Sequence, residues 1–508
     1  MPLRPARRPR RLTLLVAALV GQFMLATGCR AQSSEAEEPI SRPGLPAEVR
    51  TLKQFGAVGD GRTDDTQALM KAFHSENRYC LDGGGATYRV VGTVEVGESL
   101  CLRNATLLQG AGPVDTSRYI NARCPAMRSA ADLVDCGDPV IPPEELDRLL
   151  RSLSVRTLFV HRSDGHPPIK VTLENVKIDR GRHADGGSRI DSAGIWVADA
   201  DRVDFRNVEI TGHGKGFGLL IAGARNVTLN NLAIHDLVWA PYRGDRPLVR
   251  SEVAAVGWNS VPIREIRAAG QQGAAASKFY GVRIQEQVTC ASLVDVQHVR
   301  IENVRIERCM ARFDVGNLPW QADGLNIGHS SRDVIIDGGL IESTWEGLDV
   351  TASGTGIEGL VVSDLAVRNS FGFGVKLGNQ LRGARLSRLI ISKAGIAGMV
   401  VYGPVSDAVI RGVTIEEVGL VRGANGVFAP WGSETRAGIR IDEGSTGESS
   451  ALSTPRNILI ENASVTTGAH PSSYEFGIFK SRGADVRAVD FKAQGFGKAQ
   501  TNDLGRPR

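Results

Sequence analysis

A motif of eight residues returns along most of this 508-residue chain and constrains its fold more than any other feature. In each copy apolar and polar residues alternate around a central position that is often Asn, as at residues 203–210 and 227–234. Asn207 and Asn231 lie 24 residues apart, and Asn303 follows 72 residues later, which is three such periods. Alternation with a period of two predicts strands, and repetition with a period of 20–50 residues is typical of a solenoid.

A second repeated element lies between copies of the first and consists of Gly, an apolar residue, any residue and another apolar residue. Its copies begin at Gly194, Gly218, Gly281, Gly324, Gly347, Gly374, Gly398 and Gly438. Two or three short strands per 24-residue turn, stacked in parallel, predict an all-β, single-domain right-handed parallel β-helix. We interpret the recurring Asn as a left-handed turn residue whose amide stacks on its neighbours, because Asn tolerates that conformation.

The first 28 residues are predicted to be a signal peptide, because an Arg-rich start precedes an apolar run up to about residue 26. Residues 25–29 resemble a bacterial lipobox, which predicts lipidation of Cys29 and a membrane anchor; cleavage after Ala31 is the alternative. The expected organisation is a signal peptide at 1–28, a linker at 29–48, the β-helix at 49–497 and a disordered tail at 498–508. We therefore expect an exported protein, lipid-anchored in a bacterial cell envelope or located in the periplasm or outside the cell.

The charge and the cysteines limit the classes of partner. The net charge of +4 falls to −1 without the five arginines of the leader, so no nucleic acid partner is expected. Apart from Cys29, six cysteines remain, an even number that suits an oxidising compartment. Their nearest sequential pairs are 80–101, 124–136 and 290–309, although six cysteines allow fifteen pairings. No zinc-type spacing occurs, and neither a metal nor a cofactor is predicted.

Residues 55–69, Phe-Gly-Ala-Val-Gly-Asp-Gly-Arg-Thr-Asp-Asp-Thr-Gln-Ala-Leu, form a Gly-rich turn followed by the start of a helix. Asp64 or Thr63 can cap this helix and Asp65 suits its positive end, so these acids, like Asp60, are interpreted as structural. The stretch closely resembles the opening of the polygalacturonase / pectate-lyase-like β-helix superfamily. That resemblance implies an N-terminal helix that caps the solenoid and a polysaccharide ligand.

Polar residues gather in the coils around residues 323–378. Adjacent parallel strands lie about 4.8 Å apart, so equivalent residues of successive coils stack into ladders. Two or three carboxylates beside a lysine on one outward face can supply a general acid, a general base and a partner for an anionic sugar. The alternative interpretation is structural: a solvated ladder in which unlike charges alternate on a sheet face. The predicted catalytic residues are Asp323, Glu346 and Asp349. The predicted substrate-binding residues are Asn326, Lys376, Arg283 and Arg440.

The same coils resemble the polygalacturonase motifs. Residues 321–326 resemble Asn-Thr-Asp-Gly-x-Asp, residues 344–349 lie where that family has paired Asp residues, and residues 372–376 resemble its Gly-His-Gly strand with Phe in place of His. Asp323 carries over directly and Glu346 conservatively, while the family's Arg-x-Lys has no counterpart in the next coil. Another Gly-His-Gly, at residues 212–214, precedes Asp323 by several coils, so His213 is interpreted as a turn residue.

Three functions are compatible with the sequence. The favoured hypothesis is a glycoside hydrolase acting on an acidic, uronate-containing, pectin-like polysaccharide. The second is a polysaccharide lyase or uronate epimerase, in which Lys376 or Arg283 would act as base or carboxylate neutraliser near Asp349. The third is a non-catalytic β-helix that binds glycans at the cell surface.

Overall fold

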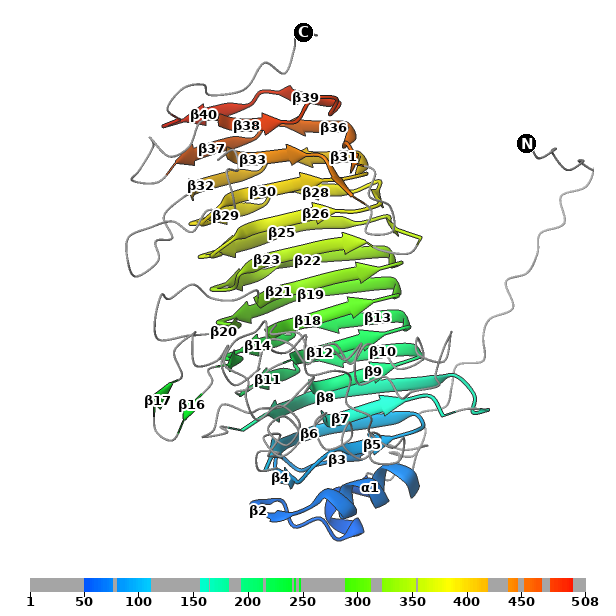
Figure 1. Cartoon of the computed structure of the whole chain (residues 1–508). Coiled ribbons are helices and arrows are strands. Elements are labelled where there is room, and N and C mark those ends of the chain that lie inside the picture. The colour runs from blue at the N-terminus through cyan, green and yellow to red at the C-terminus, as the bar shows by residue number, and fades with distance from the viewer. Residues whose placement is uncertain are drawn as a thin grey trace, which may run out of the picture. The chain divides into compact units, whose positions relative to one another are not determined.

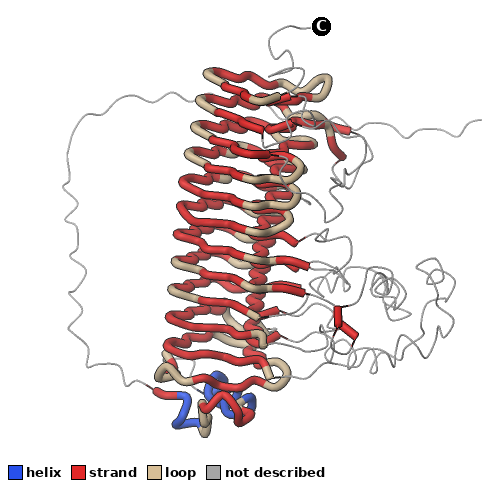
Figure 2. The backbone as a smooth tube through the Cα atoms, turned by 90° about the vertical axis from the view of Figure 1, so that its left-hand side faces the viewer, coloured by secondary structure: helices blue, strands red, loops and turns tan. Residues whose placement is uncertain are grey.

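The chain divides into two units, Met1–Ala47 and Glu48–Arg508, and only the second contains described residues. The computed structural model describes residues 50–75, 80–110, 156–163, 165–181, 193–212, 216–239, 242–243, 246–247, 288–311, 322–352, 355–418, 437–445, 452–467 and 476–496. Within them the strands stack as successive coils, from α1 at one end to β40 at the other (Figure 1). In the side view the coils lie regularly above one another (Figure 2).

Two long parallel sheets make up the described coils. One has eleven strands, in the order β38, β33, β30, β26, β23, β21, β18, β12, β9, β7, β5. Their bounds are β5 Val94–Val96, β7 Arg156–His161, β9 Ala193–Ala198, β12 Gly216–Ala222, β18 Val288–Val294, β21 Ala322–His329, β23 Glu346–Ala352, β26 Phe373–Gly378, β30 Ala397–Tyr402, β33 Ala437–Asp442 and β38 Phe476–Lys480.

The other long sheet comprises 23 of the described strands and carries the Asn-centred motif. Its strands are β1 Arg50–Thr51, β2 Asp60–Asp64, β3 Leu81–Asp82, β4 Thr87–Val90, β6 Leu100–Gln109, β8 Ile169–Asp179, β10 Ala200–Arg206, β11 Glu209–Thr211, β13 Arg225–Asn230, β14 Ala233–His235, β19 Gln297–Glu307, β22 Arg332–Glu342, β24 Ile357–Glu358, β25 Val361–Arg368, β27 Leu381–Arg382, β28 Arg385–Ser387, β29 Ile390–Ser392, β31 Ser406–Arg411, β32 Thr414–Val418, β36 Arg456–Glu461, β37 Ser464–Thr467, β39 Val486–Val489 and β40 Lys492–Gln494. Short pairs join β15 Val238–Trp239 to β20 Met310–Ala311, β16 Tyr242–Arg243 to β17 Arg246–Pro247, and β34 Gly444–Ser445 to β35 Leu452–Ser453.

The strand register confirms the right-handed parallel β-helix predicted from the repeats. Equivalent residues of the motif pair coil to coil, as Val203 does with Val227 and Val227 with Val299. The central Asn residues have the left-handed conformation, with φ of 52° at Asn207 and 55° at Asn231. Their amides stack as predicted, because Asn231 Nδ2 donates to Asn207 Oδ1 over 3.0 Å.

The N-terminal helix closes one end of the apolar core. Helix α1, Thr66–Ser75, buries Leu69 and Phe73 in the core that the coils share. The Asp64 carboxylate accepts a hydrogen bond from the Thr66 backbone N–H over 3.0 Å. Asp65 is 1% exposed and accepts the Val58 backbone N–H over 2.6 Å, so both acids are structural as predicted. A 3₁₀ turn, η1 Leu52–Phe55, precedes this segment.

The glycine of the second repeated element is required by close contact between coils. A Cβ atom at Gly347 would lie 2.5 Å from the carbonyl oxygen of Gly374, and one at Gly374 would lie 2.7 Å from that of Gly398. Because real Cβ atoms do not approach backbone this closely, the coils of β23 and β26 need the glycine where the strand turns toward the core.

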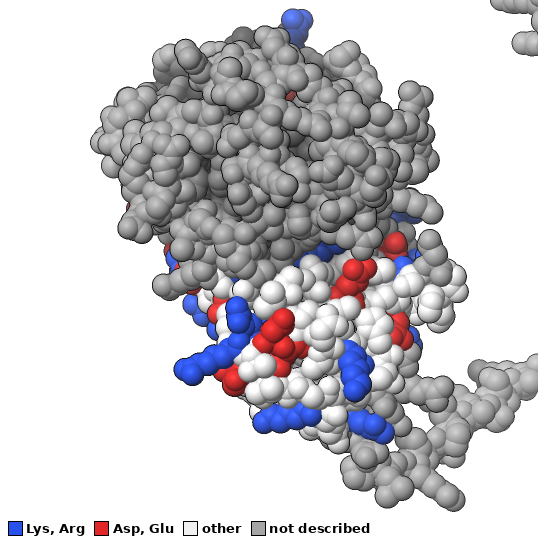
Figure 3. Space-filling view, turned by 60° about the horizontal axis from the view of Figure 1, so that its bottom comes forward, with Lys and Arg blue, Asp and Glu red and all other residues white. Residues whose placement is uncertain are grey.

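Two of the three predicted disulfides are confirmed, Cys80–Cys101 and Cys290–Cys309. The predicted pair 124–136 lies outside the described residues, as do Cys29, His213 and the predicted tail. In the part of the chain that the structure describes, no helix is long and apolar enough to cross a membrane. Around the end that carries α1, the described residues present basic and acidic side chains side by side (Figure 3).

Candidate active site

Three neighbouring strands of the eleven-stranded sheet bring the predicted polar residues together. The register pairs Asp323 of β21 with Glu346 of β23, and Asn326 of β21 with Asp349 of β23. Asp349 in turn pairs with Lys376 of β26. Asn326 alternates with inward-facing core residues, so the ladder lies on the outer face of the sheet. The predicted stacking of Asp323 on Glu346, and of Asn326, Asp349 and Lys376 on one another, is confirmed.

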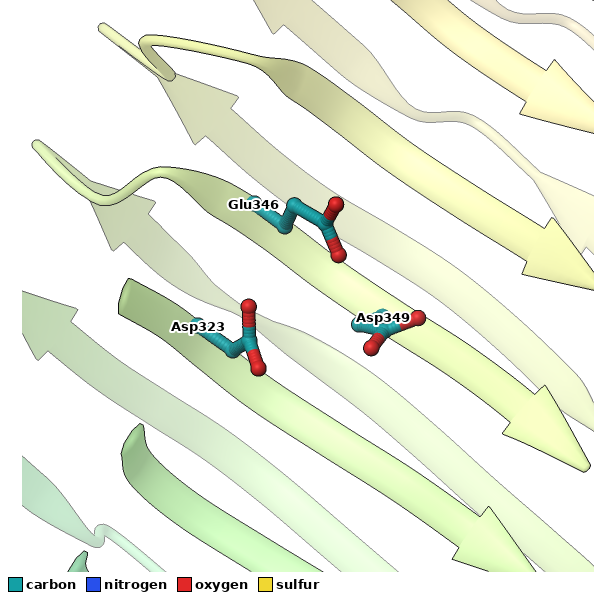
Figure 4. A group of neighbouring side chains, drawn as sticks. All are labelled: Asp323, Glu346 and Asp349. Atoms are coloured by element: carbon teal, nitrogen blue, oxygen red, sulfur yellow. The ribbon is translucent and has the colours of Figure 1, made fainter. Parts of the chain in front are cut away.

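The three carboxylates converge. Taking one oxygen from each, Asp323, Glu346 and Asp349 lie within 4.8 Å of one another (Figure 4). Each residue is only 4% exposed although none belongs to the apolar core. Buried acidic residues are rare unless they are paired, because charge is costly to remove from water. The arrangement therefore departs from the solvated charge ladder that was the structural alternative.

Lys376 compensates part of this negative charge. Its Nζ donates to Glu346 Oε2 over 2.8 Å and lies 3.5 Å from Asp349 Oδ1. Burial alone would lower the pKa of Lys376, but the carboxylates of Asp349 and Glu346 outweigh it and raise that pKa above its usual range. The carboxylates therefore favour the protonated form of the Lys376 amine.

Glu346 has the environment of a proton donor. Burial, followed by the negative charge of Asp349, raises the pKa of Glu346 to about 7, against the opposing effect of Lys376. A carboxyl group with such a pKa carries its proton over a wide range of pH below neutrality.

Asp349 is held in place by hydrogen bonds to both of its carboxyl oxygens. Its Oδ1 accepts the hydroxyl of Thr351 over 2.5 Å, and its Oδ2 accepts the amide of Asn326 over 3.1 Å. Asn326 is fixed in turn, because Ser292 donates to its Oδ1 over 3.0 Å. Both oxygens of Asp349 thus receive donors, which holds the carboxyl group in one orientation.

Thr351 and Ser292 were not predicted from the sequence. Ser292 occupies the ladder position before Asn326, where the sequence placed Arg283, and this placement of Arg283 is wrong. The register pairs Leu220 with Ser292, so β18 and not residues 281–284 forms the coil. The cause is Cys290, which stands where the other copies have Gly and hides this copy of the motif. Arg283 itself lies outside the described residues.

Arg440 lies on the same face but apart from the carboxylates. The register runs from Lys376 through Val400 to Arg440, two coils further on. Its guanidinium pairs with Asp442. Arg440 therefore lies outside the carboxylate cluster.

The three carboxylates could also hold a metal cation, because each offers one oxygen and these oxygens lie close together. The ammonium of Lys376, however, already contacts two of them. This fixed positive charge favours acid–base chemistry over metal binding at the cluster.

Comparison with known proteins finds similar proteins but does not assign the chain to a family. No known family's profile matches the chain. A 43-residue stretch is 54% identical to the tail spike protein of an Escherichia phage, which is 8% of this chain and 5% of that protein, so the chain spans about a twentieth of this curated relative.

Several solved structures resemble this chain at low sequence identity. PfbA, a surface adhesin of Streptococcus pneumoniae, is 14% identical over 89% of this chain and 91% of its own, with a TM-score of 0.44. The family 28 exopolygalacturonase of Yersinia enterocolitica is 11% identical over 91% and 79%, with a TM-score of 0.42. The A-module of the mannuronan C-5 epimerase AlgE4 of Azotobacter vinelandii is 13% identical over 89% and 100%, with a TM-score of 0.39. The chain's own strand register, and not these comparisons, defines the class of protein. It is a parallel β-helix with a buried carboxylate cluster on one sheet.

Proposed function

We propose that this protein is a glycoside hydrolase that cleaves a polysaccharide at the cluster of Asp323, Glu346 and Asp349. The observation that carries the proposal is the contrast between two neighbouring carboxyl groups. Glu346 is buried with a raised pKa, whereas Asp349 accepts two hydrogen bonds. Glycoside hydrolysis requires a carboxyl group that keeps its proton beside a second, firmly held carboxyl group.

In the proposed reaction Glu346 donates its proton to the glycosidic oxygen as the bond to the anomeric carbon breaks. Asp349 and Asp323 hold a water molecule, which loses a proton to one of them as its oxygen bonds to the anomeric carbon. Lys376 keeps the carboxylates together and limits the rise in the pKa of Glu346. Each acid–base group is expected to contribute about 10²–10⁴-fold to the rate.

The proposed substrate is an acidic, uronate-containing polysaccharide of the pectin type. The resemblance of residues 55–69 and 321–349 to polygalacturonases supports this class. Asn326 and Lys376 would contact the sugar at the cluster. Arg440, three coil steps of about 4.8 Å from Asp349, would meet a carboxylate of a sugar further along the chain. The disulfides support export to an oxidising compartment, where such polymers occur.

Hydrolysis is favoured over the lyase or epimerase alternative by the state of Lys376. A base must be deprotonated before it can remove a proton from a sugar carbon. The carboxylates beside Lys376 raise its pKa, so its amine is a poor candidate for that role.

The test is incubation of the purified protein with a panel of uronate-containing and neutral polysaccharides. We expect new reducing ends without the ultraviolet absorbance of unsaturated sugars. Asp323→Asn, Glu346→Gln and Asp349→Asn should each lower turnover by about 10²–10⁴-fold while folding normally.

The matched control is Asp364→Asn, which removes an exposed acid paired with Arg388 on the other sheet and should leave turnover unchanged. Unsaturated products would establish a lyase instead. Binding to a glycan of the panel without any product, or full turnover in all three site variants, would also contradict the proposal.

A further inference from the structure

A polar cavity lies on the outer face of the 23-stranded sheet, which does not carry the carboxylate cluster. Its volume is about 390 Å³, within the range of sites that bind small ligands. Strands β8, β10, β13 and β19 carry it, and they follow one another in successive coils (Figure 1). The residues that line it are Lys170, Asp201, Arg202, Asn226, Thr228 and His298.

Four of these residues form one column across the coils. Lys170 pairs with Arg202. Asn226 and His298 stand at the same position of the next two coils, each directly before a valine that pairs with the valine of the preceding coil. Lys170 is exposed between buried neighbours, so this position points outward. The column therefore presents two positive charges, an amide and an imidazole to solvent.

Thr228 makes the hollow beside this column. The register places it between Asp204 of β10 and Arg300 of β19. Arg202 holds the Asp204 carboxylate, and Glu302 holds the guanidinium of Arg300. Neither neighbour fills the space above the short threonine side chain, because each is bound to a partner on its own strand. The cavity thus follows from residue size at one position of the ladder.

The cavity offers hydrogen-bond donors that the protein itself does not use. Asp204 accepts a hydrogen bond from Arg202 Nε over 2.6 Å, which leaves both terminal nitrogens of Arg202 without a partner among the described residues. In the same part of the chain, neither the Lys170 amine nor the Thr228 hydroxyl has a hydrogen-bond partner. An arginine oriented through Nε presents its terminal N–H groups in a geometry that fits a carboxylate.

Asp201 distinguishes between two kinds of anionic ligand. Its carboxylate lines the same cavity, and like charges placed together are unfavourable, so a compact anion such as phosphate fits poorly. An acidic sugar carries both kinds of group. Its carboxylate suits Arg202 and Lys170. Its hydroxyl groups can donate to Asp201 and accept from Thr228.

We propose that this cavity is a second, non-catalytic binding site for an acidic sugar unit of a polysaccharide. A second point of attachment raises the apparent affinity for a long chain, because further contacts of the same chain become intramolecular. The choice of a uronate sugar rests on the proposed function. The cavity and its unused donors do not involve the carboxylate cluster.

The test is titration calorimetry of Glu346→Gln, which leaves the ligand intact, with a galacturonate trisaccharide. We expect Lys170→Met and Arg202→Met, each added to that background, to weaken one binding site by about 10–100-fold, since each loses a hydrogen bond to a charged group. Both side chains are exposed, so the variants should fold normally. The fully methyl-esterified trisaccharide has no charge and should bind this site just as weakly.

Arg305→Met is the matched control. Arg305 donates through Nε to Glu307 Oε1 over 2.7 Å, the same kind of bond within one strand, but it does not line the cavity. Unchanged binding in Lys170→Met and Arg202→Met, or an equal loss in Arg305→Met, would overturn the proposal. Displacement of the trisaccharide from this site by millimolar phosphate would also overturn it, because it would identify a general anion site.

The outcomes also separate this site from the proposed hydrolase function. Loss of a binding site in Lys170→Met and Arg202→Met, with no hydrolysis on the polysaccharide panel, would support the second site and remove the hydrolase function. Hydrolysis with unchanged binding in both variants would do the reverse.

Discussion

Glu346 owes its proposed role to its neighbours rather than to its own chemistry. An ordinary glutamic acid is ionised at neutral pH and cannot donate a proton efficiently. Here burial and Asp349 raise the pKa of the carboxyl group to about 7, while Lys376 works in the other direction. The balance of these effects fixes the pH range in which the site can act.

The first prediction concerns that balance. Because the general acid must be protonated, kcat/KM should fall as the pH rises through about 7. Lys376→Met removes the charge that lowers the pKa of Glu346, so the alkaline fall in kcat/KM should move to higher pH. The same change breaks a buried ion pair and should cost about 3–5 kcal/mol of stability, measured by denaturant unfolding.

Lys393→Met provides the matched control. Lys393 lies 3.9 Å from Glu417 in an exposed pair, where the same substitution should change neither the pH profile nor the stability by much. An alkaline fall that stays in place or moves to lower pH in Lys376→Met would contradict the assignment of Glu346 as the acid.

Sequence reasoning placed the ladder of the site but not its environment. The register of Asp323, Glu346, Asp349 and Lys376 follows from the repeat and the spacing of parallel strands. Thr351 was missed because its contact with Asp349 depends on side-chain direction. Ser292 was missed because Cys290 breaks the repeated pattern of its strand. A buried Glu346 with a raised pKa was expected from its neighbour Trp345, but burial of all three carboxylates was not, since the outer face of a β-helix is usually exposed to solvent.

At the scale of the elements, two kinds of position control how coils stack. In the eleven-stranded sheet, the glycine of the repeated element, such as Gly347 or Gly374, lies against the backbone of the next coil. The Asn of the other sheet takes the left-handed conformation and bonds to the Asn of the preceding coil. The first position excludes a side chain, whereas the second accepts one.

Gly374→Ala and Gly412→Asn test this difference. A Cβ atom at Gly374 would lie 2.3 Å from Ile391 Cγ2, so the alanine variant should lose about 1–3 kcal/mol of stability through overpacking. Gly412 has a φ of 62° and occupies the ladder position of the Asn residues, and its nearest contact to a Cβ would be 3.8 Å. Asn there should be neutral or add about 0.4–1 kcal/mol by restricting the unfolded chain.

Denaturant unfolding of both variants measures the two effects. Equal losses of stability, or a larger loss in Gly412→Asn, would show that the glycines are not distinguished by their contacts with neighbouring coils.

At the scale of the whole molecule, the repeat made the fold predictable. Each coil buries its apolar residues only against its neighbours, so one 24-residue pattern specifies the stack. The capping helix followed from the resemblance of residues 55–69, and α1 occupies that place. Strand β18 has Cys290 in place of the repeated glycine, which is why the sequence predicted the strand between β12 and β21 at Gly281 and not at β18.

The export of the protein leads to a prediction about Cys29. We propose that residues 1–28 are removed and that Cys29 carries the lipid anchor, because residues 25–29 resemble a lipobox after an Arg-rich leader. The wild-type protein should therefore sediment with membranes in fractionated cells, and Cys29→Ala should be found in the soluble fraction. Equal distribution of the two proteins would contradict lipidation at this residue.

The central claim is that the carboxylate cluster adds water across a glycosidic bond. The most direct measurement is mass spectrometry of the products formed in water enriched in the heavy oxygen isotope. Hydrolysis by the wild-type protein should place one solvent oxygen in each new reducing end, and Glu346→Gln should form such ends at least about 10²-fold more slowly. Products that carry no solvent oxygen, or labelled products formed at the wild-type rate by Glu346→Gln, would contradict the account.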